Sequence, residues 1–155
     1  MLSKISNPGT FEEKNYNWIL HEGSPQDDYY KGHNTLHYQM FDAEVPYITK
    51  FAEQTFKKFA ISLIKQMPGM CIPLHKDTYY FFKQKHGLLP EHNVYRANIF
   101  LEDWKPGHYF EAGDEPYVNW KAGDFLMLNK DLGHRSANIG TVPKYTAQVT
   151  GILLD

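Results

Sequence analysis

The 155-residue sequence is poor in several features, and each shortage excludes a class of protein. A single cysteine, Cys71, rules out an internal disulfide framework and a zinc site built from several cysteines. Sixteen basic residues against eighteen acidic ones give a net charge of −2, which disfavours sequence-independent binding of nucleic acid. No apolar run approaches the roughly 18 residues of a membrane span, and the N-terminus lacks the apolar block of a signal peptide. We therefore expect a cytoplasmic protein without nucleic-acid or membrane partners.

Arginine is also scarce, since Arg96 and Arg135 are the only two, and an arginine inside a predicted strand needs a role. Aromatic residues, in contrast, are abundant (11 Tyr, 10 Phe and 3 Trp), which indicates a ring-lined core or cleft. The eight histidines are the main sign of chemistry, because imidazole is the commonest metal ligand. Cys71 is expected to be a buried small hydrophobe. Surface positions are expected for five histidines in polar or loop contexts: His21, His33, His37, His86 and His92.

The length suits one domain covering residues 1–155. Residues 1–44 mix turn-forming residues with short aromatic runs, so an irregular segment with one or two strands is expected. Apolar residues at three- and four-residue spacing predict an amphipathic helix over 45–59, with Pro46 in its first turn. Residues 60–155 contain short β-branched and aromatic segments separated by Gly-containing turns, which predict antiparallel strands. The predicted fold class is mainly β, a barrel or sandwich with one flanking helix.

Two chemistry-bearing residues, His75 and Asp77, stand two positions apart in the strand-like segment 72–77. Residues i and i+2 of an extended chain project to the same face, so this imidazole and carboxylate can converge. Octahedral Fe(II) sites of oxygenases use two histidines and one carboxylate and leave positions open. His134, 57 residues after Asp77, is the best candidate for the second histidine. Taken alone, the His-x-Asp pair also fits two surface residues, and His134 also fits a turn.

Aromatic residues follow this pair directly. The rings of residues 79–82, Tyr79, Tyr80, Phe81 and Phe82, could belong to the core of a next strand or form a wall over a substrate pocket. Trp104, beside a Pro-Gly turn, is a second candidate for that wall. The candidate substrate residues are Tyr79, Tyr80, Trp104 and Arg135, although Arg135 also fits a solvated surface charge.

The ordered features resemble the core of the Fe(II)- and 2-oxoglutarate-dependent oxygenases, nearest to the aspartyl/asparaginyl and prolyl hydroxylase-like branches. The resemblance covers roughly residues 60–152 and is carried by PGMCIPLHKD, YRANIFLEDW, WKAGDFLMLNKDLGHRSANIG and PKYTAQVTG. These stretches follow the family's order of a Pro-Gly turn, His-x-Asp, an Arg- or Asn-bearing strand, W-x-x-G-D, a distal histidine and a later basic residue. The family fold is a double-stranded β-helix, a jelly-roll barrel of the cupin type.

The resemblance implies roles residue by residue. His75, Asp77 and His134 match the iron ligands and hence the catalytic centre. Lys144, ten positions after the distal histidine, matches the cation that pairs with the far carboxylate of 2-oxoglutarate. Thr146 matches a hydroxyl that helps to hold the same carboxylate. The implied cofactors are Fe(II), 2-oxoglutarate as co-substrate and O2, and the alternative for Lys144 is an exposed lysine at a strand edge.

Arg96 and Asn98 alternate with an apolar row, so both should face the opposite side of their strand, towards the barrel mouth. By the resemblance, this strand contributes polar contacts to 2-oxoglutarate or to the substrate. A buried arginine requires an anionic partner. That partner could be the co-substrate, an acidic substrate or a structural Asp or Glu.

The first hypothesis is a 2-oxoglutarate-dependent dioxygenase that hydroxylates an amino-acid, peptidyl or other small substrate and forms succinate. By the resemblance, Asp77 favours hydroxylation, because related halogenases carry a small residue at its position. The alternative is a cupin-like metal-binding protein or isomerase that does not use 2-oxoglutarate. The expected partner is a small molecule or peptide, and a homodimer could supply a missing pocket wall. Demethylation of nucleic acid is disfavoured by the net charge of −2.

Overall fold

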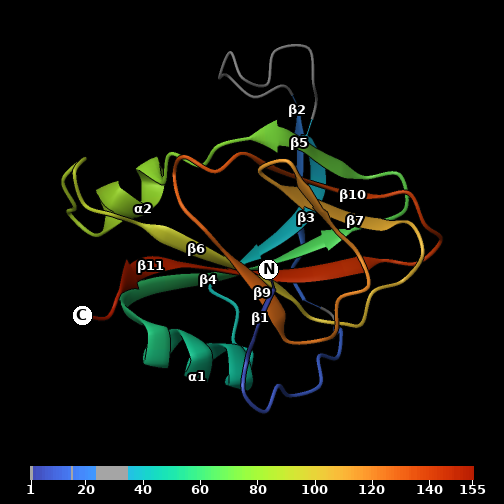
Figure 1. The fold of residues 1–155 in the computed structure, drawn as a ribbon, viewed down its shortest axis with the longest axis horizontal. Helices are drawn as coiled ribbons and strands as arrows, with labels where there is room; N and C mark the ends of the chain where they lie inside the picture. The colour runs from blue at the N-terminus through green and yellow to red at the C-terminus, as the bar shows by residue number, and fades with distance from the viewer. Residues whose placement is uncertain (1, 15, 24–34) are drawn as a thin grey trace.

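The computed structural model describes residues 2–14, 16–23 and 35–155 (Figure 1). In chain order its elements are β1 (Ser3–Lys4), β2 (Ile19–Gly23), β3 (Thr35–Phe41), α1 (Pro46–Thr55), β4 (Phe56–Gln66), β5 (Cys71–His75), α2 (Tyr80–Lys85), β6 (Tyr95–Phe100), β7 (His108–Ala112), β8 (Glu115–Tyr117), β9 (Asp124–Leu128), β10 (His134–Asn138) and β11 (Lys144–Leu153). The strands form two antiparallel sheets, a seven-stranded one in the order β1-β9-β6-β11-β4-β3-β2 and a four-stranded one in the order β5-β10-β7-β8. The chain is mainly β, as predicted. None of the described helices is long and apolar enough to cross a membrane.

The larger sheet buries one face beneath α1, which runs along the lower side of the molecule in Figure 1. Ile48 and Ala52 of α1 pack with Ala97, Ile99 and Val149 of the sheet, and all five side chains are fully buried. Because side chains alternate along a strand, the residues between them project into the space between the two sheets. That interior contains the three predicted metal ligands.

Aromatic rings fill one end of the interior, as the composition indicated. Phe100 stacks on Trp120 with ring centroids 3.9 Å apart and meets Phe110 edge to face at 5.8 Å. Together with Leu126 and Leu128 these rings form a core cluster separate from the one beneath α1. The ring-filled end leaves less room for solvent beside the polar residues of the interior.

The predicted helix over 45–59 is too long at its C-terminal end. α1 ends at Thr55, and Phe56 already has extended backbone angles. Phe56 and Phe59 belong to β4, which pairs with β11 along its length. The hydrogen-bond ladder to β11 therefore prevails over continuation of the helical pattern.

Two further expectations need correction. The rings at 79–82 do not belong to a next strand: Tyr79 has a left-handed backbone (φ 58°) and caps α2, a second helix that was not predicted. The N-terminal 44 residues contribute three strands rather than one or two, and β3 pairs with β4 inside the larger sheet. Residues 24–34 of this segment lie outside the described residues.

Candidate metal centre

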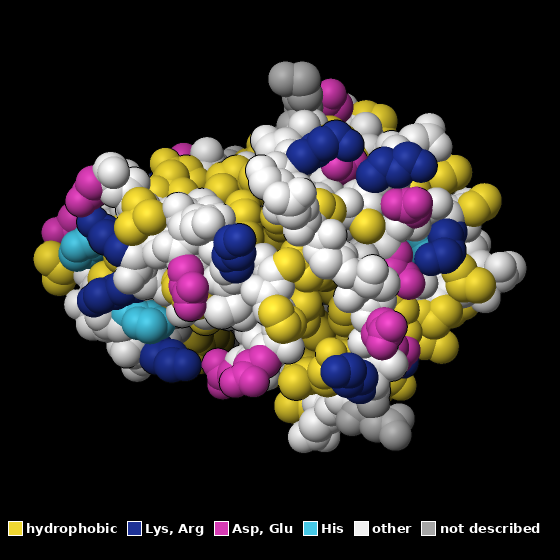
Figure 2. Space-filling view, turned by 90° about the horizontal axis from the view of Figure 1, so that it is seen from below, with side chains coloured by type: hydrophobic (Ala, Val, Ile, Leu, Met, Phe, Trp, Pro, Cys, Tyr) yellow, Lys and Arg dark blue, Asp and Glu magenta, His cyan; other side chains and the backbone are white. Residues whose placement is uncertain are grey.

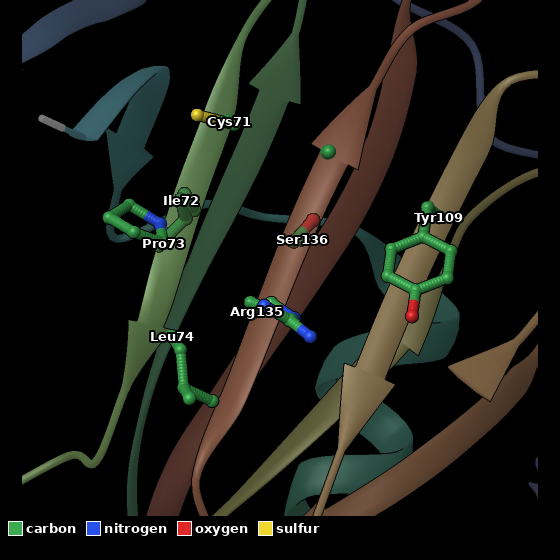
Figure 3. A pocket seen from close by; sticks show the side chains of 8 residues that line it. Cys71, Ile72, Pro73, Leu74, Tyr109, Arg135 and Ser136 are labelled. Atoms are coloured by element: carbon green, nitrogen blue, oxygen red, sulfur yellow. The ribbon is translucent and has the colours of Figure 1, made fainter. Parts of the chain in front are cut away.

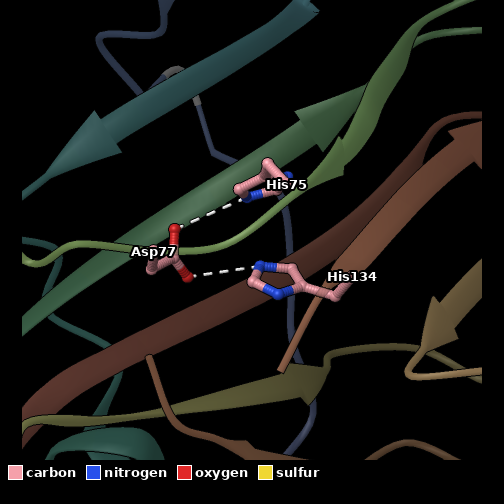
Figure 4. Close-up of side chains that lie close together, drawn as sticks. All are labelled: His75, Asp77 and His134. Carbon is pink, nitrogen blue, oxygen red and sulfur yellow. Dashed lines mark ion pairs between the residues drawn. The ribbon is translucent and has the colours of Figure 1, made fainter. Parts of the chain in front are cut away.

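Three side chains converge in the interior, and they are the three predicted as ligands (Figure 4). His75 ends β5 and His134 begins β10, and the two are directly opposite in the antiparallel register. Asp77 follows β5 by two residues and turns back to both rings. One ligand atom from each of the three residues lies within 4.8 Å of the others.

The backbone fixes the orientation of both imidazoles. The Nδ1 of His75 lies 2.8 Å from the carbonyl oxygen of Pro73, and that of His134 lies 3.1 Å from the carbonyl oxygen of Leu132. A carbonyl oxygen only accepts, so each Nδ1 donates, and the Nε2 of a neutral ring then bears a lone pair. These Nε2 atoms face Asp77 at 3.4 Å from Oδ1 and 3.2 Å from Oδ2.

This arrangement suits a cation. The Oδ2 of Asp77 and the Nε2 of His134 are both buried and have no hydrogen-bond partner among the described residues. Two electron-pair donors 3.2 Å apart repel each other unless a positive ion lies between them. Histidines whose second nitrogen donates to a backbone carbonyl are typical metal ligands. Two imidazoles and one carboxylate are the donor set of non-haem Fe(II) oxygenases, and the residues present therefore fit such an ion.

Arg96 supports Asp77 from the other side. Its Nη1 lies 3.2 Å from Oδ2 of Asp77, and its Nε donates to Oγ1 of Thr150 at 2.8 Å. The guanidinium carbon lies 5.3 Å from the centre of the Tyr79 ring. The predicted anionic partner of Arg96 was the co-substrate, an acidic substrate or an acidic residue of the chain. The structure shows an acidic residue of the chain in contact, the candidate metal ligand Asp77.

The charge state of Asp77 follows from these neighbours. Burial alone would raise the pKa of the Asp77 carboxyl, but the positive charge of Arg96 opposes burial, and the pKa lies far below its usual value. Asp77 is therefore a carboxylate, which is the form that binds a metal ion.

A small cavity of about 30 Å³ adjoins the two histidines. Asn98, Ser136 and Thr146 line it together with apolar side chains such as Phe110. The Nδ2 of Asn98 is buried without a hydrogen-bond partner in the described part of the chain, so the cavity contains a donor that an oxygen of a ligand would satisfy. As predicted, Asn98 lies on the strand face opposite the apolar row.

Lys144 lies beyond this cavity and is fully buried, so the alternative of an exposed edge lysine is wrong. Its Nζ donates to Oγ of Ser136 at 2.8 Å and to Oε1 of Gln66 at 3.1 Å, and it lies 5.7 Å from the centre of the Trp120 ring. Burial lowers the pKa of Lys144 to about 7. No carboxylate in the described ranges forms an ion pair with it.

Three candidate substrate residues lie away from the triad. Arg135 points from the opposite face of β10 and pairs with Glu111, its Nε 2.6 Å from Oε2. There it borders a cavity of about 520 Å³ on the outer side of the smaller sheet (Figure 3). Trp104 donates its Nε1 to the carbonyl oxygen of His108 at 2.8 Å and packs in the aromatic cluster. Tyr80 is largely exposed and lines no cavity that borders the triad.

Two other side chains differ from expectation. Cys71 is exposed, although it stands four residues before the inward-facing His75, because the pairing of β5 with β10 shifts register between the two and leaves Cys71 opposite Ala137. His37 is buried in β3 and stacks on His21 at a centroid distance of 5.1 Å. Burial, together with the charges of His21 and His75, lowers the pKa of His37 to about 4. A surface position for His37 was therefore wrong, and His33 lies outside the described residues.

The sequence reasoning missed Gln66 and Ser136, which hold the ammonium group of Lys144. Ser136 could have been found, because it stands two residues after His134 and shares its strand face. Gln66 ends a strand far away in sequence and carries no motif, so only the pairing of β4 with β11 brings it opposite Lys144.

No family model matches the chain, and no curated protein matches it either. Solved structures do match. A predicted oxalate decarboxylase from Thermotoga maritima superimposes with a TM-score of 0.51 at 15% identity over 89% of this chain and 95% of that one. KdgF from Halomonas sp. gives 0.51 at 9% identity over 95% and 96%. A Pseudomonas putida prolyl-4-hydroxylase gives 0.55 at 10% identity over 76% and 70%.

At these identities the likeness concerns the fold alone. It agrees with the two facing antiparallel sheets and the interior site described above. The chain has a cupin-like jelly-roll fold, and inside it a His75–Asp77–His134 triad that could bind a metal ion.

Proposed function

We propose that this chain is an Fe(II)- and 2-oxoglutarate-dependent dioxygenase that hydroxylates a small substrate. The observation that carries the proposal is the convergence of two imidazoles and one carboxylate, each of which offers one ligand atom within 4.8 Å of the others. The chemistry that Fe(II) supplies in such a set is activation of dioxygen, here coupled to decarboxylation of 2-oxoglutarate to succinate.

The chain's own residues have separate tasks in this proposal. His75, Asp77 and His134 hold the ion, and the carbonyl groups of Pro73 and Leu132 keep both rings in the ligating tautomer. Arg96 restrains the carboxylate of Asp77.

The residues beyond the triad would hold the co-substrate. Lys144, buried without a carboxylate partner in the described residues, supplies a positive charge behind Ser136, which lines the small cavity. Thr146 and Asn98 supply hydrogen-bond donors there, and the donor of Asn98 has no partner among the described residues. A buried carboxylate needs both a charge and hydrogen bonds. Since the cavity has room for about one water molecule, binding of 2-oxoglutarate requires side chains to move aside.

A second candidate is a cupin-like metal-binding protein or isomerase that does not use 2-oxoglutarate. Two observations favour it. The cavity is small, and the ammonium group of Lys144 already has hydrogen bonds to Gln66 and Ser136 without any ligand. Among the similar structures, a predicted oxalate decarboxylase stands beside the prolyl-4-hydroxylase, so the fold is compatible with either function.

The test measures succinate formed from 2-oxoglutarate with Fe(II) and ascorbate under air, in the wild type and in His75→Ala. We expect turnover in the wild type and none in the variant; equal turnover in both would contradict the assignment. The second measurement is anaerobic binding of 2-oxoglutarate to the Mn(II)-loaded protein. Lys144→Ala should abolish this binding if the first candidate is right, and wild-type protein that binds Mn(II) but not 2-oxoglutarate would favour the second.

A further inference from the structure

A second cavity opens next to the metal centre, at the mouth of the interior. It has a volume of about 340 Å³, which lies within the usual range for small-molecule sites. Polar side chains of the sheet line it, among them Ser62, Arg96 and Thr150, and aromatic side chains from β3 and α2 line it as well. We call it the mouth cavity.

Arg96 connects the mouth cavity with the metal centre. Its contact with Asp77 at 3.2 Å is an ion pair without hydrogen-bond geometry, since Oδ2 of Asp77 has no hydrogen-bond partner. Within the described part of the chain, the only hydrogen bond of its guanidinium is the one from Nε to Thr150. Nε is bonded to Thr150 and Nη1 faces Asp77, so Nη2 is the terminal group that keeps its hydrogen-bonding capacity at a wall of the cavity. A guanidinium nitrogen of this kind donates a charge-assisted hydrogen bond to a carboxylate.

The charges around the mouth cavity favour an anion. Arg96 and Lys85 line it, and Asp42 is the one acidic residue that does so among the described residues. Asp42 and Lys85 are both exposed, so water screens their charges more than that of half-buried Arg96. At the end of the molecule where α2 lies, Figure 2 shows lysine and histidine side chains with acidic ones among them, and the last turn of this helix contains Lys83 and Lys85.

The remaining walls of the mouth cavity are aromatic. Phe41 at the end of β3 is 50% exposed, and Phe81 on α2 is 81% exposed, yet both line the cavity together with buried Phe82. Large apolar rings left in water beside a cavity of this size mark a surface that binds an apolar group. Aromatic rings from two different elements therefore line the same cavity.

We propose that the mouth cavity binds the substrate of the metal centre, and that this substrate is a carboxylic acid with an aromatic or other flat apolar group. The carboxylate pairs with Arg96 and the apolar group contacts Phe41 and Phe81. Because Arg96 also contacts Asp77, the acid end lies beside the metal ligands, and the carbon to be oxidised is within a few bonds of the carboxylate. The inference rests on the proposed function only in naming the bound acid a substrate.

The test measures ligand binding rather than turnover, on metal-free protein, so that coordination of a carboxylate by a metal ion cannot mimic it. The probe is 3-phenylpropanoate, titrated by NMR, with 3-phenylpropanamide and 2-phenylethylamine as neutral and cationic controls. Phe81→Ala removes one wall, and Arg96→Lys keeps the charge but removes the planar group. Ile139→Ala is the matched control, because Ile139 is 83% exposed and lines neither interior cavity.

We expect saturable binding of 3-phenylpropanoate, about tenfold weaker in Phe81→Ala, about fivefold weaker in Arg96→Lys and unchanged in Ile139→Ala. The amide and the amine should bind at least about fivefold more weakly than the acid. The proposal is overturned if no binding occurs at about 10 mM, if the amide or amine binds as well as the acid, or if Phe81→Ala behaves like Ile139→Ala. Failure of the metal-dependent turnover described above, with this binding intact, would contradict the proposed function and leave the acid site standing.

Discussion

Two buried polar clusters lie between the same two sheets, and they are built in opposite ways. In the triad cluster, His75, Asp77 and His134, two facing atoms have no hydrogen-bond partner in the described residues. In the second, which we call the lysine cluster, Gln66, Ser136, Asn138 and Lys144 hydrogen-bond to one another or to neighbouring backbone. A buried group without a partner is costly. The first cluster therefore indicates a binding site, and the second contributes stability as well as charge.

The change in metal affinity should be greatest when a residue of the triad cluster is replaced. Asp77→Ala should weaken Mn(II) binding by more than about 100-fold, because it removes a charged ligand. Equilibrium dialysis measures this, with circular dichroism as the check on folding. Asn138→Ala is the control from the lysine cluster and should retain metal affinity within about threefold. Equal loss in both variants would mean that the two clusters are not distinct.

Asn138→Ala should instead lower the free energy of unfolding by about 2–4 kcal/mol. Its Nδ2 donates to the carbonyl oxygens of Gln66 and Val142, and its Oδ1 accepts from the backbone N–H of Gly140, so all three backbone groups lose a partner. Urea unfolding of the metal-free protein measures the change. A loss below about 0.5 kcal/mol would show that water replaces the side chain and that the cluster is not structural.

The lysine cluster should also make the stability of the protein depend on pH. Burial lowers the pKa of Lys144 to about 7 from an ordinary value of 10.5, so the unfolded chain holds more protons between these values. The free energy of unfolding should consequently rise as the pH rises above 7. Urea titrations between about pH 7 and 9, below the ionisation of tyrosine in the unfolded chain, test this. In Lys144→Met the rise should disappear, and a rise of the same size in both proteins would assign it to another group.

The smallest effect is expected on the outer face of β10. Arg135 and Glu111 form a partly exposed ion pair there, turned away from both clusters. Arg135→Ala should change the free energy of unfolding by less than about 1 kcal/mol and leave Mn(II) affinity unchanged. A clear loss of turnover with the acid substrate in this variant would restore Arg135 as a substrate residue.

The triad could be predicted from sequence because two of its residues are close together in the chain and the third belongs to a motif with a fixed place in the order of motifs. His75 and Asp77 are two residues apart, and His134 follows the last turn before β10. Alternation likewise predicted the inward face of Asn98. These features depend on the period of a strand and on order along the chain, which a sequence displays directly.

The rest depends on pairing between distant segments, which no local pattern reveals. α1 stops at Thr55 because β11 competes for Phe56 and the residues after it. Phe81 and Phe82 line the mouth cavity from a helix whose short span gives no periodic signal. Arg96 meets Asp77 only because β6 lies beneath the chain that leaves β5. In each case tertiary contacts outweigh local preference.

The direct opposition of His75 and His134 across β5 and β10 has a consequence for how such a site can vary. Because the two histidines are paired across neighbouring strands, the strand pairing sets the distance between their rings. The 58 residues that separate them in sequence do not affect this distance. Insertions, deletions or exchanged loops in that intervening stretch can reshape the mouth of the barrel while the spacing of the two ligands stays constant. A change of strand register by one residue, in contrast, would turn one histidine to the outside and destroy the site.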